Sequence, residues 1–223
     1  MVEPKFILKP LSPIAVNAAL LSVVLGILFV LLLGCLHLLE PEFDPMWRFI
    51  SEYALGDFGW MMHLAFGVLA MCLISTCVAI FSQIRTIVGF IGLVILGISA
   101  VGMFFAAIFV TDPMTASPDE ATFNGKMHVL GATLDYTPVA ALLLSFALVR
   151  NQAWRPIRKR LFITAGITLI AMAAFMFQIP HDGQFGPDIL AGLFGRLLIL
   201  SYFGWLFTVG IHALKLSKQA VSS

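Results

Sequence analysis

The stretch IAVNAALLSVVLGILFVLLLGCLHLL, residues 14–39, contains no acidic residue, no lysine and no arginine. It is longer than the roughly 20 apolar residues that an α-helix needs to cross the hydrocarbon core of a bilayer. The stretch therefore predicts a transmembrane helix.

Five more apolar runs of similar length follow it along the chain. The composition agrees, because 60% of the residues are hydrophobic and 11% are charged, whereas a soluble domain has about 25% charged residues. The loops are short, so neighbours in sequence should pack as antiparallel neighbours. We expect an all-α, polytopic integral membrane protein, with one six-helix transmembrane domain over residues 1–223. The predicted spans are residues 14–39, 60–81, 86–110, 127–149, 161–179 and 189–214.

The same composition excludes several classes of protein. No hydrophilic block is long enough to form a second domain, and no basic stretch could hold a nucleic acid. The chain has no internal repeat. Membrane lipids are the partners that remain, and the sequence does not indicate an oligomeric state.

The basic residues predict the orientation in the membrane, since lysine and arginine stay in cytoplasmic loops. Ten of the 13 fall on the side that carries both termini, which we therefore expect in the cytoplasm, as for a bacterial inner-membrane protein. The ten are Lys5, Lys9, Arg85, Arg150, Arg155, Arg158, Lys159, Arg160, Lys215 and Lys218.

Two outer loops contain signals for short helices. Asp44 is an N-cap residue followed by Pro45, and Gly56 is suited to end a helix, so residues 45–55 should form a short helix in the outer interface. In the third loop, a capping-box pattern predicts a turn of helix that begins at Pro118.

Four of the five histidines are predicted to lie in one layer at the outer face: His37, His63, His128 and His181. Glu52, Asp57, Asp112 and Asp182 fall at the same level. These residue types bind zinc or iron and move protons. Zinc bound by His63, His128 and His181 is one interpretation, and haem between His63 and His128 is the alternative. The simpler interpretation is that the histidines bridge headgroups, water and backbone at the interface.

Two charged residues are predicted deep inside the spans. Asp135 and Arg196 should each lie roughly 12 to 14 Å below the outer surface, at about 1.5 Å of rise per residue. Because a charge in the membrane is usually paired, we predict a buried Asp135–Arg196 salt bridge, with Tyr136 and Gln178 as hydrogen-bond partners. It would form the floor of a polar cavity in which Arg196 attracts a headgroup or a substrate phosphate. Alternatively, it only joins two helices.

Glycines on the third and sixth spans should allow neighbouring backbones to approach closely. They are Gly89, Gly92, Gly97 and Gly102 on the third span, and Gly192 and Gly195 on the sixth. Close packing at Gly192 should help to bring Arg196 inward.

Several short motifs carry a resemblance to a known family. They are Phe43-Asp44-Pro45, then Ile50-Ser51-Glu52-Tyr53 with Gly56, Asp112 at the end of the third span, and His128 with Gly131-Ala132 in the fourth. The chain resembles the bacterial membrane family called domain of unknown function 998, over nearly its whole length in span number and order. It is more distantly similar to the eukaryotic damage-regulated autophagy modulators. These likenesses imply lipid handling, and they map Ser51, Glu52, Asp112 and His128 onto family-type positions.

The leading hypothesis is an outward-facing polar cavity that binds lipid headgroups, with metal-dependent lipid hydrolysis as its enzymatic form. In that form the three histidines bind the metal, Asp112 or Glu52 is the general base, and Arg196 holds the substrate anion. The candidate catalytic residues are Glu52, Asp112 and His128, and the candidate substrate-binding residues are Ser51, Asp135, Tyr136 and Arg196.

Two rival hypotheses come from other classes of protein. One is a haem-binding electron-transfer protein, and the other is a non-catalytic scaffold or lipid-asymmetry factor. A channel or transporter is disfavoured, because the spans show no charged pore ring, no pair of broken helices and no repeat symmetry.

Overall fold

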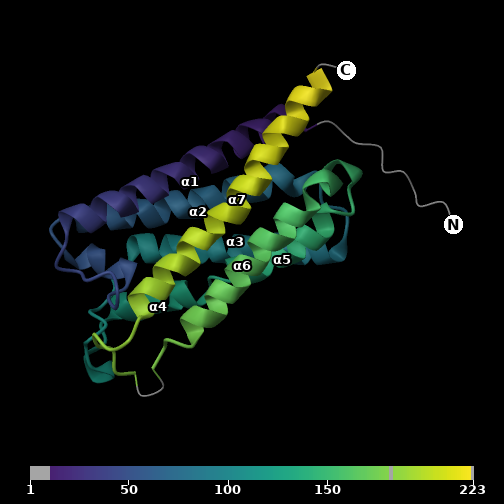
Figure 1. Ribbon diagram of the computed structural model, residues 1–223. Coiled ribbons are helices and arrows are strands. Elements are labelled where there is room, and N and C mark those ends of the chain that lie inside the picture. The colour runs from purple at the N-terminus through teal and green to yellow at the C-terminus, as the bar shows by residue number, and fades with distance from the viewer. Residues whose placement is uncertain (1–10, 181–182, 222–223) are drawn as a thin grey trace.

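The computed structural model describes residues 11–180 and 183–221, and these form helices and loops with no strand among them. Six helical segments are long and apolar enough to cross a membrane. The chain is therefore an all-helical, multi-pass membrane protein, as its apolar runs predict (Figure 1).

The described residues contain seven α-helices and three short 3-10 helices. Ser12, Thr86 and Thr122 each precede an α-helix, and each side chain accepts a hydrogen bond from the backbone N–H three residues later, which satisfies a free donor of the first turn. The α-helices are α1 (Pro13–Leu39), α2 (Gly59–Phe81), α3 (Ile87–Ile108), α4 (Phe123–Thr133), α5 (Thr137–Leu148), α6 (Arg158–Met176) and α7 (Ala191–Val221); the 3-10 helices are η1 (Ile50–Leu55), η2 (Pro118–Glu120) and η3 (Gln152–Ile157).

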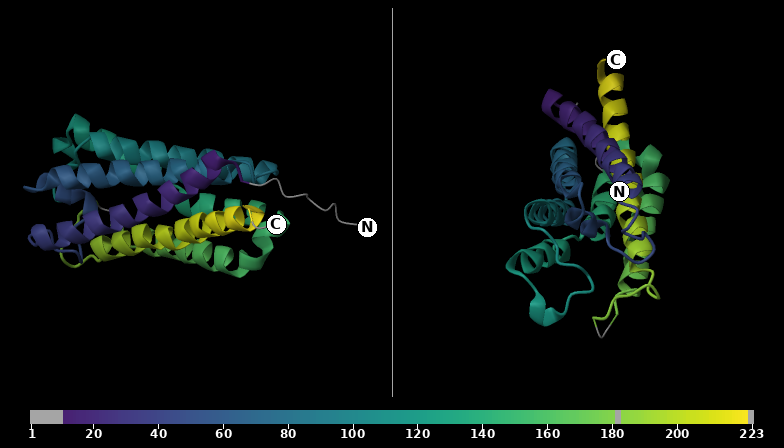
Figure 2. Two further views of the ribbon diagram at one scale, coloured as in Figure 1. Left: turned by 90° about the horizontal axis from the view of Figure 1, so that it is seen from above. Right: turned by 90° about the vertical axis from the view of Figure 1, so that its left-hand side faces the viewer.

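The spans pack in a ring. Each one lies against its neighbour in sequence, and α7 returns to pack on α1, which closes the ring (Figures 1 and 2). Within the fourth span, α4 packs mainly on α3, whereas α5 contacts both α3 and α6.

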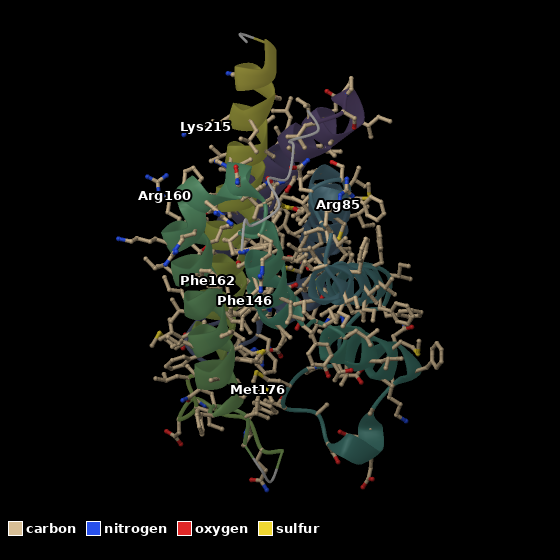
Figure 3. All side chains as sticks on the ribbon, turned by 90° about the vertical axis from the view of Figure 1, so that its right-hand side faces the viewer. Arg85, Phe146, Arg160, Phe162, Met176 and Lys215 are labelled. Atoms are coloured by element: carbon tan, nitrogen blue, oxygen red, sulfur yellow. The ribbon has the colours of Figure 1, made fainter. Side chains whose placement is uncertain are left out.

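The two ends of the bundle differ in composition. α1 begins and α7 ends at one end, toward which Arg85, Arg160 and Lys215 also lie (Figures 2 and 3). We call this the basic end. The opposite end, which we call the histidine end, carries His37, His63 and His128.

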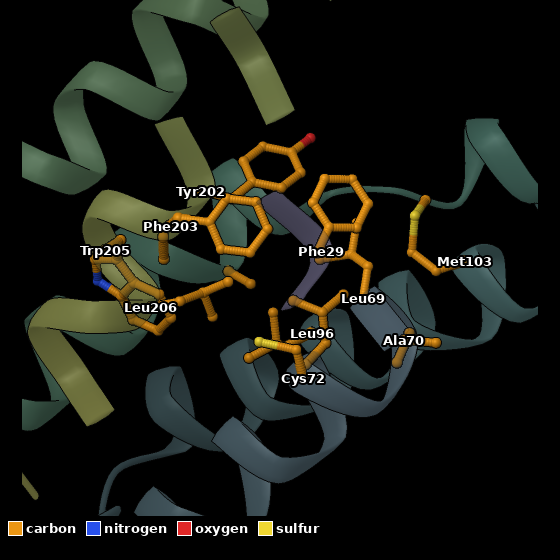
Figure 4. Packing of buried hydrophobic residues seen from close by; sticks show 14 of the residues in the cluster. Phe29, Leu69, Ala70, Cys72, Leu96, Met103, Tyr202, Phe203, Trp205 and Leu206 are labelled. Carbon is orange, nitrogen blue, oxygen red and sulfur yellow. The ribbon is translucent and has the colours of Figure 1, made fainter. Parts of the chain in front are cut away.

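Large aromatic and aliphatic side chains fill the centre of the bundle. Phe29 of α1 and Phe203 of α7 have ring centroids 5.3 Å apart, and Trp205 donates its Nε1–H to Ser145 Oγ at 2.9 Å. Leucine and methionine side chains of α2 and α3 complete this cluster (Figure 4). Lipid tails are as apolar as these side chains, so close packing and interhelical hydrogen bonds hold the spans together.

Glycines allow α3 and α4 to cross closely. A Cβ on Gly102 would lie 2.4 Å from the Gly131 carbonyl oxygen, and a Cβ on Gly131 would lie 2.6 Å from that of Gly102. The predicted close approach of backbones is confirmed at Gly102 and Gly192, whereas the nearest neighbours of Gly89, Gly92 and Gly195 are side chains. It is wrong at Gly97, whose Cβ would meet nothing within 4 Å.

The fourth span is confirmed over Phe123–Leu148, but it is interrupted, because α4 ends at Thr133 and α5 begins at Thr137. Pro138 explains the interruption: it lacks an N–H, and its ring would clash with the carbonyl of Leu134 in a continuous helix. Backbone groups freed inside a membrane need new partners. The Asp135 carboxylate accepts from Thr137 N at 3.1 Å, and Ser99 Oγ accepts from Tyr136 N at 2.9 Å.

The predicted helix over residues 45–55 is only partly formed. Asp44 accepts a hydrogen bond from Met46 N at 2.9 Å, as an N-cap residue would. The turn that follows ends before Phe49, whose backbone is extended, and a separate 3-10 helix covers Ile50–Leu55. The predicted turn at Pro118 is confirmed as η2.

We expect Gly102→Ala to lower the unfolding midpoint of the protein in detergent, because its new Cβ meets backbone and the two helices must move apart at a cost of about 1–3 kcal/mol. Gly97→Ala on the same helix is the matched control, and it should leave the midpoint unchanged or raise it slightly, since alanine is favoured over glycine in a helix. Equal midpoints for the two variants would contradict the crossing.

Candidate functional site

Arg196 organises the histidine end. It lies in the second turn of α7 and is only 6% exposed. Its Nε donates to His37 Nε2 at 2.8 Å, its Nη1 donates to the carbonyls of Arg48 (2.6 Å) and Gly192 (3.1 Å), and its Nη2 donates to Tyr53 Oη at 3.0 Å. Four of the five N–H donors of the guanidinium are therefore used, and every acceptor is a neutral group.

The contact with Arg196 fixes the protonation state of His37. An arginine has no acceptor, so His37 Nε2 must accept from it and cannot carry a proton. His37 Nδ1 lies 2.7 Å from the Leu33 carbonyl, which is also only an acceptor, so the ring proton is on Nδ1. The imidazole is neutral in this arrangement and adds no positive charge beside Arg196.

Residues 43–56, which we call the cap segment, lie against the first turn of α7. Leu193 N–H donates to the Met46 carbonyl at 2.9 Å, which satisfies one of the free donors at the start of α7. A Cβ on Gly192 would lie 2.4 Å from the Arg48 carbonyl oxygen, so this contact requires glycine. The predicted contribution of Gly192 to the position of Arg196 is thus confirmed as a backbone contact.

Arg48 is held in place within the cap segment. Its guanidinium carbon lies 4.9 Å from the ring centroid of Trp47 and 5.2 Å from that of Phe43, and its Nε lies 3.3 Å from Glu52 Oε2. Among the described residues, no hydrogen-bond partner is found for its terminal nitrogens, and its side chain is 19% exposed. Arg48 therefore has donors that an anion could use.

Glu52 joins the cap segment to the loop between α3 and α4. Its carboxylate is fully buried and accepts from Met114 N at 3.0 Å and from Phe49 N at 3.2 Å. Burial raises the pKa of Glu52 above its ordinary value, and the two hydrogen bonds and Arg48 oppose that rise. Ser51, its neighbour in η1, is half-buried.

Glu40, at the end of α1, is a second buried acid. It is 1% exposed, and its Oε1 accepts from Phe58 N at 2.5 Å, while no partner for Oε2 is found among the described residues. A Cβ on Gly56 would overlap this carboxylate, which explains the glycine there. Burial raises the pKa of Glu40, and the nearby charges of Glu42 and Asp57 add to the rise.

His63 of α2 and His128 of α4 flank the last turn of α3. His63 Nδ1 lies 2.8 Å from the Ala107 carbonyl, and His128 Nδ1 lies 2.9 Å from the Phe109 carbonyl. Both rings thus satisfy carbonyls that the end of α3 leaves free. No hydrogen bond of either Nε2 is found within residues 11–180 and 183–221, so both nitrogens could bind a metal.

The predicted metal set of three histidines can be compared with the structure only at His63 and His128. His181 lies outside the described residues. Within the described part of the chain, no three His, Cys, Asp or Glu side chains are placed to hold one metal ion.

Asp112 anchors the start of α4. Its carboxylate accepts from the backbone N–H of Thr122 at 2.9 Å and from the hydroxyl of Thr122 at 2.7 Å. A Cβ on Gly125 would overlap the same carboxylate. Both oxygens of Asp112 are thus engaged in local structure.

The predicted Asp135–Arg196 salt bridge is wrong. Asp135 Oδ1 accepts from Thr137, and its Oδ2 accepts from the Tyr202 hydroxyl at 2.8 Å, whereas Arg196 is bonded to the cap segment and His37. The ion pair found among the described residues is Arg48–Glu52. The two charges lie at different depths, because Asp135 contacts Tyr202, which is more than one helical turn beyond Arg196 on α7.

Tyr136 and Gln178 make no side-chain hydrogen bond to Asp135 or Arg196 in the described structure. The Tyr136 ring is 51% exposed on the outside of the bundle. The hydrogen-bond partners of Asp135 are Thr137 and Tyr202 instead. The sequence reasoning missed Tyr53 and Glu40 as buried polar residues. Gly56 is a signal for Glu40, since a glycine is required where the buried carboxylate of Glu40 fills the space that a Cβ would occupy.

The model of the family described as "Protein of unknown function (DUF998)" matches residues 23–212. Searches of curated proteins and of solved structures give no match. The resemblance to this family is therefore confirmed, while the bacterial origin and the more distant likeness to autophagy modulators stay predictions.

The buried carboxyl of Glu40 should make the stability of the protein depend on pH. Because the pKa of Glu40 is raised above its ordinary value of 4.5 in the folded protein, the folded state binds this proton more tightly than the unfolded state. Relative to Glu40→Gln, the wild type should be most stable below the ordinary value and lose stability as pH rises through the raised pKa. Unfolding midpoints of both proteins across this pH range measure the difference.

Asp119→Asn, a change in exposed η2, is the control, and its pH profile should run parallel to that of the wild type. A constant difference between wild type and Glu40→Gln at every pH would contradict the prediction.

Proposed function

This chain belongs to the family of proteins of unknown function DUF998, and from its own geometry we propose that it binds phosphate-bearing headgroups of membrane lipids at the histidine end. The proposal includes the orientation expected from the basic residues, with the basic end in the cytoplasm of a bacterium and the histidine end at the outer surface of the inner membrane.

The donors of Arg48 carry this proposal. Planar guanidinium groups bind phosphate oxygens through two parallel hydrogen bonds. Stacking on Trp47 and Phe43 and the ion pair with Glu52 hold Arg48 in one orientation, and its terminal nitrogens have no partner among the described residues. A ligand phosphate would therefore meet donors that are already positioned.

The local charge supports an anionic ligand. Arg48 and Arg196 contribute two positive charges, Glu52 contributes one negative charge, and His37 is neutral in its present hydrogen bonds. These four side chains thus carry one excess positive charge, while the acids Glu42, Asp44 and Asp57 are exposed in the same loop. Arg196 would not contact the ligand directly, since four of its donors are already used. Its positive charge would attract the anion, and its hydrogen bonds hold the cap segment in place.

Trp47 supports a position of Arg48 at the depth of lipid headgroups. Tryptophan is enriched at membrane–water interfaces, where one side of the ring is apolar and the other is wet. The cap segment begins just after α1 ends and lies on the first turn of α7, so it is at the end of two spans. A lipid in the adjacent leaflet would present its phosphate to Arg48 without leaving the membrane.

The proposal does not include hydrolysis. Both oxygens of Asp112 accept from Thr122, and those of Glu52 accept from backbone N–H groups. Hydrogen bonds of this kind favour the ionised carboxylate. Because they also hold the histidine end together, we assign both carboxylates a structural role.

We expect Arg48→Gln to lower the capture of a phospholipid by the cap segment about tenfold or more, because a hydrogen bond to a charged group contributes about 1.5–3 kcal/mol. The measurement uses a photoactivatable phosphatidylglycerol in vesicles that contain the purified protein, with peptide mapping of residues 43–56. Arg160→Gln removes the same charge at the basic end and should leave this labelling unchanged. Equal labelling in Arg48→Gln and wild type would refute the proposal.

A second proposal is metal or haem binding by His63 and His128, which rests on their two Nε2 atoms. Zinc and iron per polypeptide in tag-free protein test it. A bound metal should be lost in His63→Ala and His128→Ala but kept in His212→Ala, whose ring bonds the Ala153 carbonyl at the basic end. Absence of both metals from the wild type would remove this second proposal.

A further inference from the structure

The interruption between α4 and α5 places a carboxyl group at the middle of a membrane span. The span runs over Phe123–Leu148, and Asp135 stands at its midpoint. It occupies neither helix, because Pro138 prevents the two from joining. An ionisable group at this depth is costly and usually has a function.

No cation neutralises Asp135 in the described structure. α5 contributes Thr137, whose N–H and hydroxyl donate to Oδ1 at 3.1 and 2.7 Å. α7 contributes the Tyr202 hydroxyl, 2.8 Å from Oδ2, and α3 contributes Ser99. Tyr202 is the titratable group among these neighbours, and none of them is charged at neutral pH.

A proton can neutralise this carboxyl group within the same contacts. In the ionised state the Tyr202 hydroxyl donates to Oδ2. In the protonated state Oδ2–H can donate to the Tyr202 oxygen across the same 2.8 Å distance, because a hydroxyl both donates and accepts. Thr137 keeps both of its hydrogen bonds to Oδ1 in either state. The site can therefore gain or lose a proton without a change of backbone.

The surroundings favour a proton over a metal cation. A sodium ion requires several oxygen ligands around it, and here the hydroxyls of Thr137 and Tyr202 could serve only if they turned their protons away from Asp135. No second carboxylate joins it, and the described residues contain no three-ligand metal group.

We propose that Asp135 is a proton-binding site in the membrane interior, which takes up and releases one proton with Tyr202 as its hydrogen-bond partner. The site is independent of the proposed headgroup site, since it involves α5 and α7 and none of the cap segment. A carboxyl group that changes charge at the middle of a broken span is the element that proton-coupled movement across a membrane requires.

Dicyclohexylcarbodiimide, an apolar reagent that enters membranes, tests the proposal because it reacts with a protonated carboxyl group. The acid proton moves to a carbodiimide nitrogen and the carboxyl oxygen bonds to the carbodiimide carbon, so no other reactant is needed. The protein in lipid vesicles is labelled at a series of pH values between about 5 and 9, and the peptide that contains Asp135 is quantified by mass. We expect labelling at low pH that falls about tenfold per pH unit above a midpoint.

Three variants locate the signal. Tyr202→Phe removes the donor to the ionised form and should raise the midpoint of labelling by about one pH unit, since that hydrogen bond favours the charge. Asp188→Asn, in an exposed loop, should leave the midpoint unchanged. Asp135→Asn should abolish labelling of the peptide.

Three outcomes would overturn the proposal. No labelling of Asp135 in the folded protein at any pH, with labelling after denaturation, would mean that it never binds a proton. Labelling that does not change with pH would mean that the proton is never released. Protection by sodium, but not by choline, at constant pH would assign the site to a metal cation. None of these outcomes affects the test of Arg48, which uses another ligand and another segment.

Discussion

A buried guanidinium group that forms no ion pair with a described carboxylate determines the structure of the histidine end. Arg196 donates to His37, to the Arg48 carbonyl and to Tyr53, so one side chain joins the end of α1, the cap segment and the start of α7. Removing one partner of a buried polar contact leaves the others unsatisfied at a cost of about 1–3 kcal/mol each. The position of Arg48, and hence the proposed headgroup site, depends on this arrangement.

The same physical requirement shapes the middle of the membrane. Backbone groups there have no water to bond, so an interrupted helix persists only where side chains replace the missing partners. Asp135 caps α5, Ser99 accepts from Tyr136 N–H, and Tyr202 bonds the carboxylate from α7. Arg196 at the histidine end and Asp135 at the middle of the membrane are thus each hydrogen-bonded to neutral groups. The two opposite charges do not meet.

The sequence predicts the fold well because membrane spans are apolar over a fixed length, and hydropathy alone locates all six. Arg196 is buried, as the sequence predicts, and Asp135 is half-buried, but the two do not lie at the same depth. Their partners were not predictable, since rotation about the helix axis and the choice between neutral and charged partners depend on packing. Pro138 was a readable signal for the broken span and Gly56 was an indirect signal for Glu40, whereas nothing in the sequence pointed to Tyr53.

The most direct test of this account is hydrogen exchange of the cap segment in Arg196→Met, which keeps the length of the side chain but removes its donors. The account predicts that backbone amides of residues 46–53 exchange about tenfold faster or more than in the wild type, because the contacts that hold this segment on α1 and α7 are lost. Amides of α5 and α6 should be unchanged, and Arg160→Met should have no effect on the cap segment. Unchanged exchange over residues 46–53 in a folded Arg196→Met variant would contradict the central role of Arg196.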